Sequence, residues 1–265
     1  MKVILFGSNG MLGRYLKSYL SDKHDLVALT RADIDVSTIN EDKLMEFLRA
    51  NITKDDVVVN AIGIIKQRTS DPLDMIKVNS VFPQLLAKFK NEVGCNVIHI
   101  TTDCVFNGLK GGYIESDPHD CTDDYGKTKS LGENPNVTNI RTSIIGEELE
   151  NKKSLLEWVR SNSGKTIDGY ENHIWNGVTC LELAKLIDKI IKENMYWNGV
   201  RHVFSPTTLS KYELVSMIND IYGLGITINK KNTDIHCYRN LDSTLPPLVD
   251  KGLREQIIEL KEFKF

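Results

Sequence analysis

The chain has 265 residues, which suits one large domain or a domain and a half and is ample for a hydrophobic core. Its formal net charge is −3, and charges of both signs are interspersed. This argues against a nucleic-acid or anionic-membrane surface, which would need a basic stripe. The cysteines are odd in number and lack metal-knuckle spacing, so reduced thiols in a cytoplasmic protein are the simplest interpretation. The first apolar run is too short for an export signal, and no stretch approaches the ~20 apolar residues of a membrane span.

The first half of the chain alternates short apolar runs with segments of helical period. The apolar runs predict strands at residues 2–6, 25–30, 56–63, 96–102 and 136–146. The periodic segments predict helices at residues 11–20, 41–50, 73–94 and 125–133. The third of these helices should end at Gly94 and be distorted at Pro83. Nearly all-apolar, β-branched strands that alternate with helices indicate a parallel sheet covered by helices on both faces.

The second half is smaller and mixed in character. Helical patterns occupy residues 153–162, 180–194, 210–223 and 253–263, and short strand patterns occupy residues 199–205 and 225–231. Ser210 stands where an N-cap would start the third of these helices. The predicted fold class is α/β, with a doubly wound parallel sheet of Rossmann type and a smaller mixed α/β lobe toward the C-terminus.

Three glycines in the sequence GSNGMLG, Gly7, Gly10 and Gly13, separate the first strand from the first helix. Glycine permits the positive φ of a tight turn and lets the backbone approach phosphates closely. The N-terminus of the following helix offers unpaired N–H groups and a partial positive charge to an anion. The spacing is GxxGxxG rather than GxGxxG, and a turn that binds nothing could contain the same three glycines. Their place at the first strand–helix junction favours a dinucleotide-binding turn.

The end of the second strand usually decides which nicotinamide cofactor binds. An acidic residue there would hold the ribose 2′-hydroxyl of NAD, but Thr30 takes that place and Arg31 follows it. An arginine can pair with a 2′-phosphate, so the sequence favours NADP(H). NAD(H) remains the alternative, through Asp33 or Asp35, and Arg31 would then be a solvated loop charge.

Tyr125 and Lys129 stand four residues apart in the sequence YGKTK and share one face of the helix that follows the fourth strand. That strand ends at Thr102, and ligands of an open parallel sheet bind at the carboxyl ends of its strands. We therefore expect Thr102, Tyr125 and Lys129 to meet beside a nicotinamide. Tyr19 and Lys23 have the same spacing, but they lie at the far end of the first helix, where a solvated helix face explains them.

These three side chains suit the reduction of a carbonyl group. When hydride attacks the carbonyl carbon, the oxygen becomes an alkoxide and needs a proton. A free tyrosine has a pKa of about 10. A nearby ammonium and an oxidised nicotinamide should bring the pKa of Tyr125 toward neutrality. The Thr102 hydroxyl would orient the carbonyl oxygen, and acid catalysis of this kind is worth roughly 10²–10⁴ in rate.

Several motifs together resemble the extended short-chain dehydrogenase/reductase superfamily, and within it the dTDP-4-dehydrorhamnose reductase type. They are GSNGMLG, LTRADIDVS, VVNAIG, VNSVFPQLLA, ITTDCVFNG, GGYIESD, YGKTKSLGE and IRTSIIG. The resemblance implies NADPH-dependent reduction at carbon 4 of a dTDP- or UDP-linked 4-keto-6-deoxy sugar, as in rhamnose biosynthesis. It also implies an NADP-binding Rossmann domain at residues 1–146 and a substrate-binding lobe, interleaved with that domain, at residues 147–265.

The resemblance also implies roles for single residues. Thr102, Tyr125 and Lys129 look like the catalytic set. The implied cofactor-binding residues are Gly7, Gly10, Met11, Leu12, Gly13, Arg31, Asp35, Ala61, Ile62 and Gly63, together with Tyr125 and Lys129. The expected substrate-binding residues are Thr102, Asp103, Trp175 and Arg239. Asn79 falls on the asparagine that the superfamily places beneath the active site, and Ser243 resembles a serine that faces the nucleotide sugar.

Some expected roles have alternatives. Arg239 would clamp a diphosphate, or would be a surface charge. Trp175 would line the sugar pocket, or would fill the core of the small lobe. Cys104 stands where these reductases commonly have tyrosine, the segment before Tyr125 lacks a second proline, and the chain is short for the group. These departures leave the sugar open.

Rival functions can be weighed on the same residues. Sugar-nucleotide dehydratases carry an Asp-Glu pair after the threonine, and here Asp103 is followed by Cys104, which disfavours dehydration. Two alternatives stay open: a non-catalytic NADP-binding regulatory subunit like that of methionine adenosyltransferase, and a bifunctional 3,5-epimerase/4-reductase. No histidines pair at ligand spacing, so we expect no metal. A homodimer, or a partner epimerase or dehydratase, is compatible with the sequence.

Overall fold

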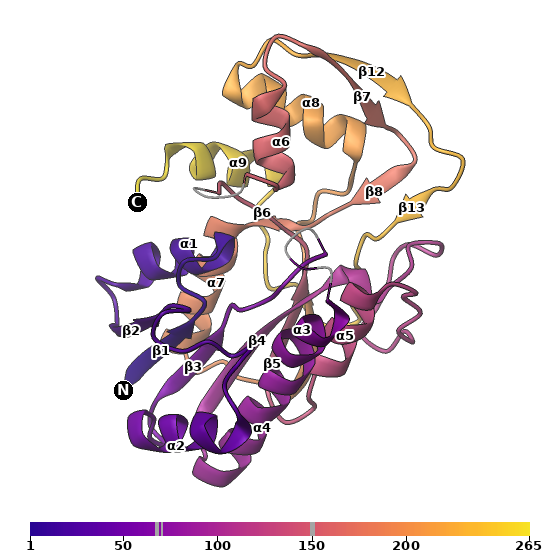
Figure 1. Ribbon diagram of the computed structural model, residues 1–265. Coiled ribbons are helices and arrows are strands. Elements are labelled where there is room, and N and C mark those ends of the chain that lie inside the picture. The colour runs from indigo at the N-terminus through magenta and orange to yellow at the C-terminus, as the bar shows by residue number, and fades with distance from the viewer. Residues whose placement is uncertain (67–68, 70, 149–151) are drawn as a thin grey trace.

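The computed structural model describes residues 1–66, 69, 71–148 and 152–265. Its centre is a six-stranded sheet in which every strand runs parallel to its neighbours, in the order β10–β5–β4–β3–β1–β2 (Figure 1). The strands are β1 (Lys2–Phe6), β2 (Asp25–Leu29), β3 (Val57–Asn60), β4 (Asn96–Thr102), β5 (Thr138–Thr142) and β10 (Gly199–Val203). The strand order reverses between β1 and β3, and ligands of such sheets bind in the crevice at this point.

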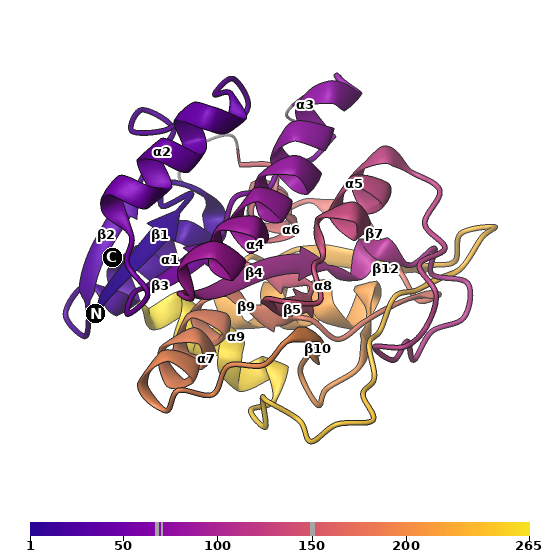
Figure 2. The ribbon, with the colours of Figure 1, turned by 90° about the horizontal axis from the view of Figure 1, so that it is seen from below.

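Helices cover both faces of the sheet, as expected from the apolar strands. The covering helices are α1 (Met11–Leu20), α2 (Glu41–Asn51), α4 (Phe82–Val93), α5 (Asp124–Gly132), α7 (Cys180–Lys192) and α9 (Leu253–Glu262). Val3 and Leu5 of β1 pack into one core with α1, α7 and α9, whereas Ile4 and Phe6 pack into a second core with α2 and α4. Figure 2 shows these two helical layers on opposite sides of the sheet. Both sides of the inner strands are therefore buried, which is why these strands read as continuous apolar runs, whereas the edge strand β2 stays partly exposed.

The helix expected at residues 73–94 is divided. Its parts are α3 (Pro72–Ile76), a π-helical turn (Lys77–Val81) and α4. The backbone N–H of Phe82 donates to the carbonyl of Lys77, five residues back instead of four. Pro83 has no N–H to give to the carbonyl of Asn79, so the distortion expected at the proline lies in the turn before it. Gly94 ends α4 in the left-handed conformation, with φ at 88°, as expected.

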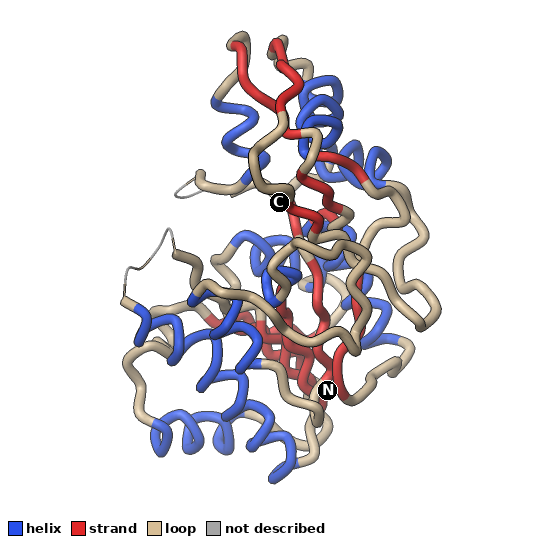
Figure 3. The backbone as a smooth tube through the Cα atoms, turned by 90° about the vertical axis from the view of Figure 1, so that its right-hand side faces the viewer, coloured by secondary structure: helices blue, strands red, loops and turns tan. Residues whose placement is uncertain are grey.

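The remaining elements form a smaller lobe beyond the edge of the sheet at which its strands end (Figures 1 and 3). They are β6 (Ile144–Ile145), α6 (Leu155–Ser161), β7 (Thr166–Tyr170), β8 (His173–Trp175), β9 (Val178–Thr179), β11 (Leu209–Ser210), α8 (Lys211–Tyr222), β12 (Thr227–Lys231) and β13 (Cys237–Tyr238). The strands pair as three small sheets, β11–β8–β13, β12–β7 and β6–β9. Ser210 caps α8 through a capping box with Glu213, which confirms the predicted start of that helix.

The lobe and the sheet share the second half of the chain. β10 returns to the main sheet, where it pairs with β5, and α7 packs against the same core as α1. The chain therefore passes from sheet to lobe and back more than once, and the division at residue 146 stays a prediction. Within the described ranges, no helix has both the length and the apolar character that crossing a membrane requires.

Candidate active site

The turn between β1 and α1 allows close approach of a ligand. Gly7 has φ at 83°, in the region that favours glycine, and a Cβ on Gly13 would lie 1.9 Å from the Gly7 carbonyl oxygen. Gly10 is the N-cap of α1 and has no side chain with which to cover the first N–H groups of the helix. These N–H groups and the helix dipole favour an anion at this point. The turn therefore has the properties that a pyrophosphate needs.

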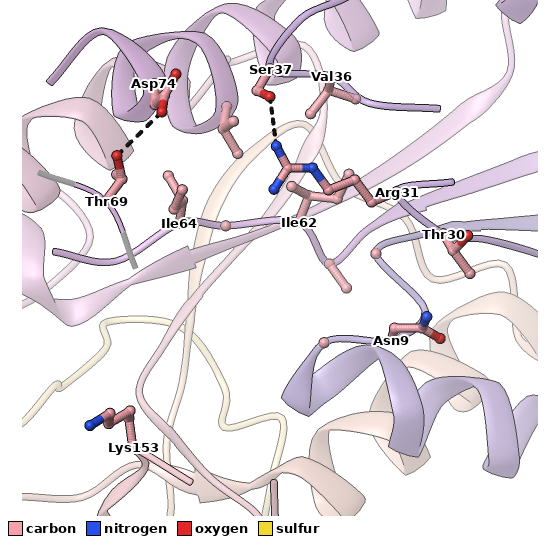
Figure 4. A pocket seen from close by; sticks show the side chains of 15 residues that line it. Asn9, Thr30, Arg31, Val36, Ser37, Ile62, Ile64, Thr69, Asp74 and Lys153 are labelled. Carbon is pink, nitrogen blue, oxygen red and sulfur yellow. Dashed lines mark hydrogen bonds between the residues drawn. The ribbon is translucent and has the colours of Figure 1, made fainter. Parts of the chain in front are cut away.

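A cleft of about 680 Å³ opens against this turn (Figure 4). The expected cofactor-binding residues that line it are Gly7, Gly10, Arg31, Ala61, Ile62 and Gly63. The other expected residues of the turn and of the second strand, which lie outside its lining, are Met11, Leu12, Gly13 and Asp35. Leu12 is buried in the core behind the turn. The cleft volume falls within the range of about 300–1,000 Å³ that is usual for small-molecule sites.

Sequence reasoning did not assign a binding role to the rest of the lining. These residues are Asn9, Thr30, Val36, Ser37, Ile64, Thr69, Asp74, Val78 and Lys153. Lys153 comes from the loop before α6 and faces the cleft from the side opposite Arg31 (Figure 4). No motif marks this lysine, because it reaches the cleft from a segment more than a hundred residues away in the chain.

Arg31 lies at the rim of the cleft, directly after β2. Its Nε donates to Asp35 Oδ2 at 2.9 Å and its Nη2 donates to Ser37 Oγ at 3.2 Å (Figure 4). Burial acts to raise the pKa of Asp35, but the hydrogen bonds from Ser37 and Arg31 outweigh it and hold that pKa below its ordinary value. Asp33 accepts from the N–H and the hydroxyl of Thr30, at 2.8 and 2.7 Å. Both acids that offered an NAD-type alternative are therefore engaged within their own loop.

The structure places Thr102 next to Tyr125, with Lys129 one helical turn further along α5. Thr102 is the last residue of β4, and the other two lie on one face of α5. The Thr102 hydroxyl is close enough to the phenol of Tyr125 to stabilise its charged form. Lys129 Nζ donates to the Ile100 carbonyl at 2.7 Å and would lie 3.9 Å from a Cβ on Gly63. Lys129 thus lies beside Gly63, which lines the cofactor cleft, although Thr102, Tyr125 and Lys129 are not themselves among its lining residues.

The protein alone does not bring the phenol toward neutrality. Burial raises the pKa of Tyr125 above its ordinary value, a nearby Cys104 adds to the rise, and the Thr102 hydrogen bond opposes it. Burial lowers the pKa of Lys129 to about 8, against the opposing charge of Glu133. Burial is the largest influence on the phenol of the protein alone, and the expected lowering of its pKa beside an oxidised nicotinamide stays a prediction. At neutral pH Tyr125 carries its proton.

Asn79 connects the floor of the cleft to α5. Its Oδ1 accepts from the Ile64 N–H at 2.9 Å, and its Nδ2 donates to the Ile64 carbonyl at 2.9 Å and to Thr128 Oγ1 at 3.2 Å. The carbonyl of Asn79 lies against Gly132, where an added Cβ would be 2.1 Å from the oxygen. The π-helical turn and the loop after β3 are thereby fixed to the helix that carries Tyr125.

Two expected substrate-binding residues lie next to the catalytic set. Asp103 is buried and accepts from the Thr102 hydroxyl at 3.2 Å. Arg239 reaches the same loop from the far end of the chain: its Nε donates to the Phe106 carbonyl at 3.1 Å, and its Nη1 donates to Cys104 Sγ at 3.6 Å. The guanidinium is therefore held beside the residues that follow Thr102.

Trp175 and Ser243, which were expected near the substrate, make contacts within the protein. Trp175 is 4% exposed and belongs to the core that the lobe shares with β1, α1 and α7, with the Lys211 ammonium 4.8 Å from its ring centroid. Ser243 donates to Glu115 Oε1 at 2.7 Å. Sequence reasoning missed Lys211, although a signal existed: a lysine in the first turn of α8 opposes the helix dipole and so calls for another explanation.

The fold and the side chains gathered at the sheet edge define a protein of the extended short-chain dehydrogenase/reductase class. The chain belongs to the family described as RmlD substrate binding domain, whose match covers residues 1–227. This family match confirms the resemblance drawn from the sequence motifs.

Known proteins are similar over most of the chain. The dTDP-4-dehydrorhamnose reductase of Aggregatibacter actinomycetemcomitans is 27% identical over 83% of this chain and 78% of its own length. Several further curated relatives match over about half of their length. The solved structure of a dTDP-4-dehydrorhamnose reductase ortholog from Clostridium acetobutylicum has a TM-score of 0.82, with 21% identity and 99% of both chains covered. That of the Bacillus anthracis reductase, in complex with NADP, also has a TM-score of 0.82, with 18% identity and 98% of both chains covered. These structures confirm the expected fold class.

Proposed function

We propose that this protein is an NADPH-dependent reductase of a nucleotide-linked 4-keto-6-deoxy sugar, of the dTDP- or UDP-4-dehydrorhamnose type. The observation that carries the proposal is the proximity of Thr102 to Tyr125, with Lys129 one turn further along α5 and next to Gly63 of the cleft that the glycine turn opens. Support comes from the family and from relatives named dTDP-4-dehydrorhamnose reductase, one of which was solved with NADP.

The residues of the cleft fit a dinucleotide. The uncovered N-terminus of α1 would hold the pyrophosphate, and Arg31 would pair with a 2′-phosphate at the rim. The loop that contains Ala61 and Gly63 would lie along the cofactor toward Lys129. The bound cofactor would supply a hydride.

The chain's own side chains then handle the carbonyl oxygen. Thr102 orients that oxygen by a hydrogen bond, and Tyr125 gives it a proton as the negative charge develops. Burial keeps the phenol protonated until that step. The Lys129 ammonium stabilises the phenolate that remains, and holds the cofactor ribose on the Gly63 side of the cleft.

The proposal extends to the cellular setting. A 4-keto-6-deoxy sugar nucleotide arises by dehydration of a sugar nucleotide, so a dehydratase, and an epimerase where the stereochemistry requires one, would act before this enzyme. We place the protein in the cytoplasm, and a homodimer or an association with such an epimerase or dehydratase is compatible with the proposal. The cysteines, all of which lie in the described part of the chain, are free thiols, which supports a reducing compartment.

The test is the oxidation of NADPH with dTDP- and UDP-linked 4-keto-6-deoxyglucose, with and without a 3,5-epimerase. Tyr125→Phe should lower kcat by about 10²–10⁴ because the proton donor is lost. Tyr19→Phe is the matched control, because Tyr19 and Lys23 repeat the spacing on α1, away from the cleft, where the Lys23 ammonium lies 3.8 Å from the Tyr19 ring centroid. Full turnover in the Tyr125→Phe variant would contradict the proposed mechanism, and no turnover of any nucleotide-linked ketosugar by the wild type would favour a regulatory role.

A further inference from the structure

The small sheet β11–β8–β13 places three side chains of the lobe beside the reaction centre. Lys211 follows β11, Trp175 ends β8, and Arg239 follows β13. Leu209 pairs with Trp175 in the antiparallel β11–β8 register, and Tyr238 pairs with the neighbouring residue of β8 in the parallel β13–β8 register. Lys211 and Arg239 therefore approach the same end of β8 from its two sides.

Neither of these cations is fully paired by the protein. The Lys211 ammonium lies over the Trp175 ring, 4.8 Å from its centroid, and has no hydrogen-bond acceptor or carboxylate partner among the residues that the structure describes. Arg239 gives Nε to the Phe106 carbonyl and Nη1 to Cys104 Sγ, which is a weak acceptor. The donors of Lys211 and the second terminal nitrogen of Arg239 are thus left for another molecule.

The two cations of this group differ in the acids near them. Asp103 is the carboxylate whose field reaches Lys211, whereas Arg239 lies in the field of both Asp103 and Asp123. Asp103 itself accepts from Thr102 and from the Cys104 thiol, at 3.2 and 3.6 Å. Burial raises the pKa of Asp103 and lowers that of Lys211, although Asp103 is buried whereas Lys211 stays partly exposed.

Partly buried cations that lack protein acceptors are stabilised by a ligand that supplies them. We propose that Lys211, together with Arg239, binds an oxyanion group of the sugar-nucleotide substrate, its diphosphate, and so selects for charged substrates. The contacts from Thr102 through Asp103 and Cys104 to Arg239 place this anion site next to the carbonyl that is reduced. The identity of the substrate rests on the proposed function; the binding of an oxyanion does not.

The test measures binding by calorimetry, separately from turnover. dTDP is the probe, and thymidine, which lacks the phosphates, is the comparison. Lys211→Met should weaken dTDP binding about tenfold or more, since charge-assisted hydrogen bonds are lost. The affinities for thymidine and NADPH should not change, and Lys211→Arg should restore most of the dTDP affinity. Turnover of a 4-ketosugar nucleotide by Lys211→Met should show a raised KM and a nearly unchanged kcat.

Lys230→Met is the matched control. The Lys230 ammonium also lies over an aromatic ring of the lobe, 4.9 Å from the centroid of Tyr212, but it is paired with Glu171. This variant should bind dTDP as the wild type does. The affinities for UDP-glucuronate and UDP-glucose show whether the site binds the diphosphate or a carboxylate of the sugar. If Lys211→Met loses only a preference for the glucuronate, a sugar carboxylate occupies the site and the diphosphate assignment is wrong.

Two results would overturn the proposal. One is unchanged binding of dTDP and of UDP-glucuronate by Lys211→Met. The other is an equal loss of thymidine and dTDP affinity, which would mean that Lys211 merely supports the packing around Trp175. If dTDP binding depends on Lys211 while no ketosugar nucleotide is reduced, the anion site stands and the proposed function fails.

Discussion

Arg31 lies at the rim of the cofactor cleft, with its side chain 75% exposed and held in place by Asp35 and Ser37. If it pairs with a 2′-phosphate, Arg31→Met should lower NADPH affinity about tenfold and leave NADH affinity unchanged. Fluorescence titration with the two dinucleotides would measure both values. Arg49→Met on α2 removes an exposed arginine outside the cleft lining and should change neither affinity. Equal losses for NADPH and NADH would show that Arg31 acts on a part that the two cofactors share.

The buried ammonium of Lys129 should make the stability of the protein depend on pH. Burial lowers its pKa to about 8 in the folded protein, below its ordinary 10.5. Between pH 8 and 10.5, Lys129 is still protonated in the unfolded chain but has lost its proton in the folded protein. The free energy of unfolding therefore increases as the pH rises. The free energy of unfolding of the wild type, relative to that of Lys129→Met, should therefore increase across this window by at most about 1.4 kcal/mol per pH unit. Urea unfolding of both proteins between pH 7 and 10 measures the difference, and a difference that does not change with pH would contradict the shifted pKa.

At the scale of elements, the contact between α5 and the π-helical turn depends on Gly132. An added Cβ would lie 2.1 Å from the Asn79 carbonyl oxygen, a backbone atom that cannot turn aside. Gly132→Ala should therefore force the two segments apart and lower the free energy of unfolding by about 1–3 kcal/mol. Gly252→Ala is the control, because a Cβ there would meet Thr207 Oγ1 at an ordinary 3.5 Å. If the two variants unfold at the same urea concentration, the close contact has little influence on stability.

Most elements of the first half were predictable because the inner strands are buried on both faces and α1, α2 and α4 each have a single apolar face. The π-helical turn was not, since periodicity does not show which carbonyl a given N–H will reach. The short strands β8, β11 and β13 were missed for a different reason. They are two or three residues long, too short for an alternating pattern, and their partners hold them in place.

Some residues of the candidate site could be predicted from the sequence and others could not. Tyr125 and Lys129 could be predicted as a pair because one helix carries both, and Thr102 because it ends a predicted strand. Lys153 and Lys211 could not, because they reach the site from segments whose positions depend on the packing of the lobe. The expectation for Trp175 was open for the same reason, and its ring lies in the core.

At the scale of the whole molecule, a buried cluster of polar side chains joins the sheet to α5. Arg141 of β5 donates to both carboxylate oxygens of Glu133, at 3.0 and 2.6 Å, and to the rings of His202 and His119, at 2.8 and 2.6 Å. The Thr101 hydroxyl of β4 donates to Glu133 as well. Three strands and the end of α5 are thus joined through the buried Arg141–Glu133 pair.

This cluster gives a prediction about stability. The side chains of Arg141 and Glu133 are 2% and 7% exposed, so Arg141→Met would leave a buried carboxylate without its partner. The free energy of unfolding should fall by about 3–5 kcal/mol, and adding Glu133→Gln should recover part of the loss because the unpaired charge is gone. Arg49 and Glu92 form the same two-bond geometry at 2.6 and 2.8 Å with side chains 52% and 41% exposed. Water can replace that exposed partner, so Arg49→Met should hardly change the urea midpoint. If Arg141→Met were no more destabilising than Arg49→Met, burial would not make the Arg141–Glu133 pair any more important to the fold than a pair at the surface.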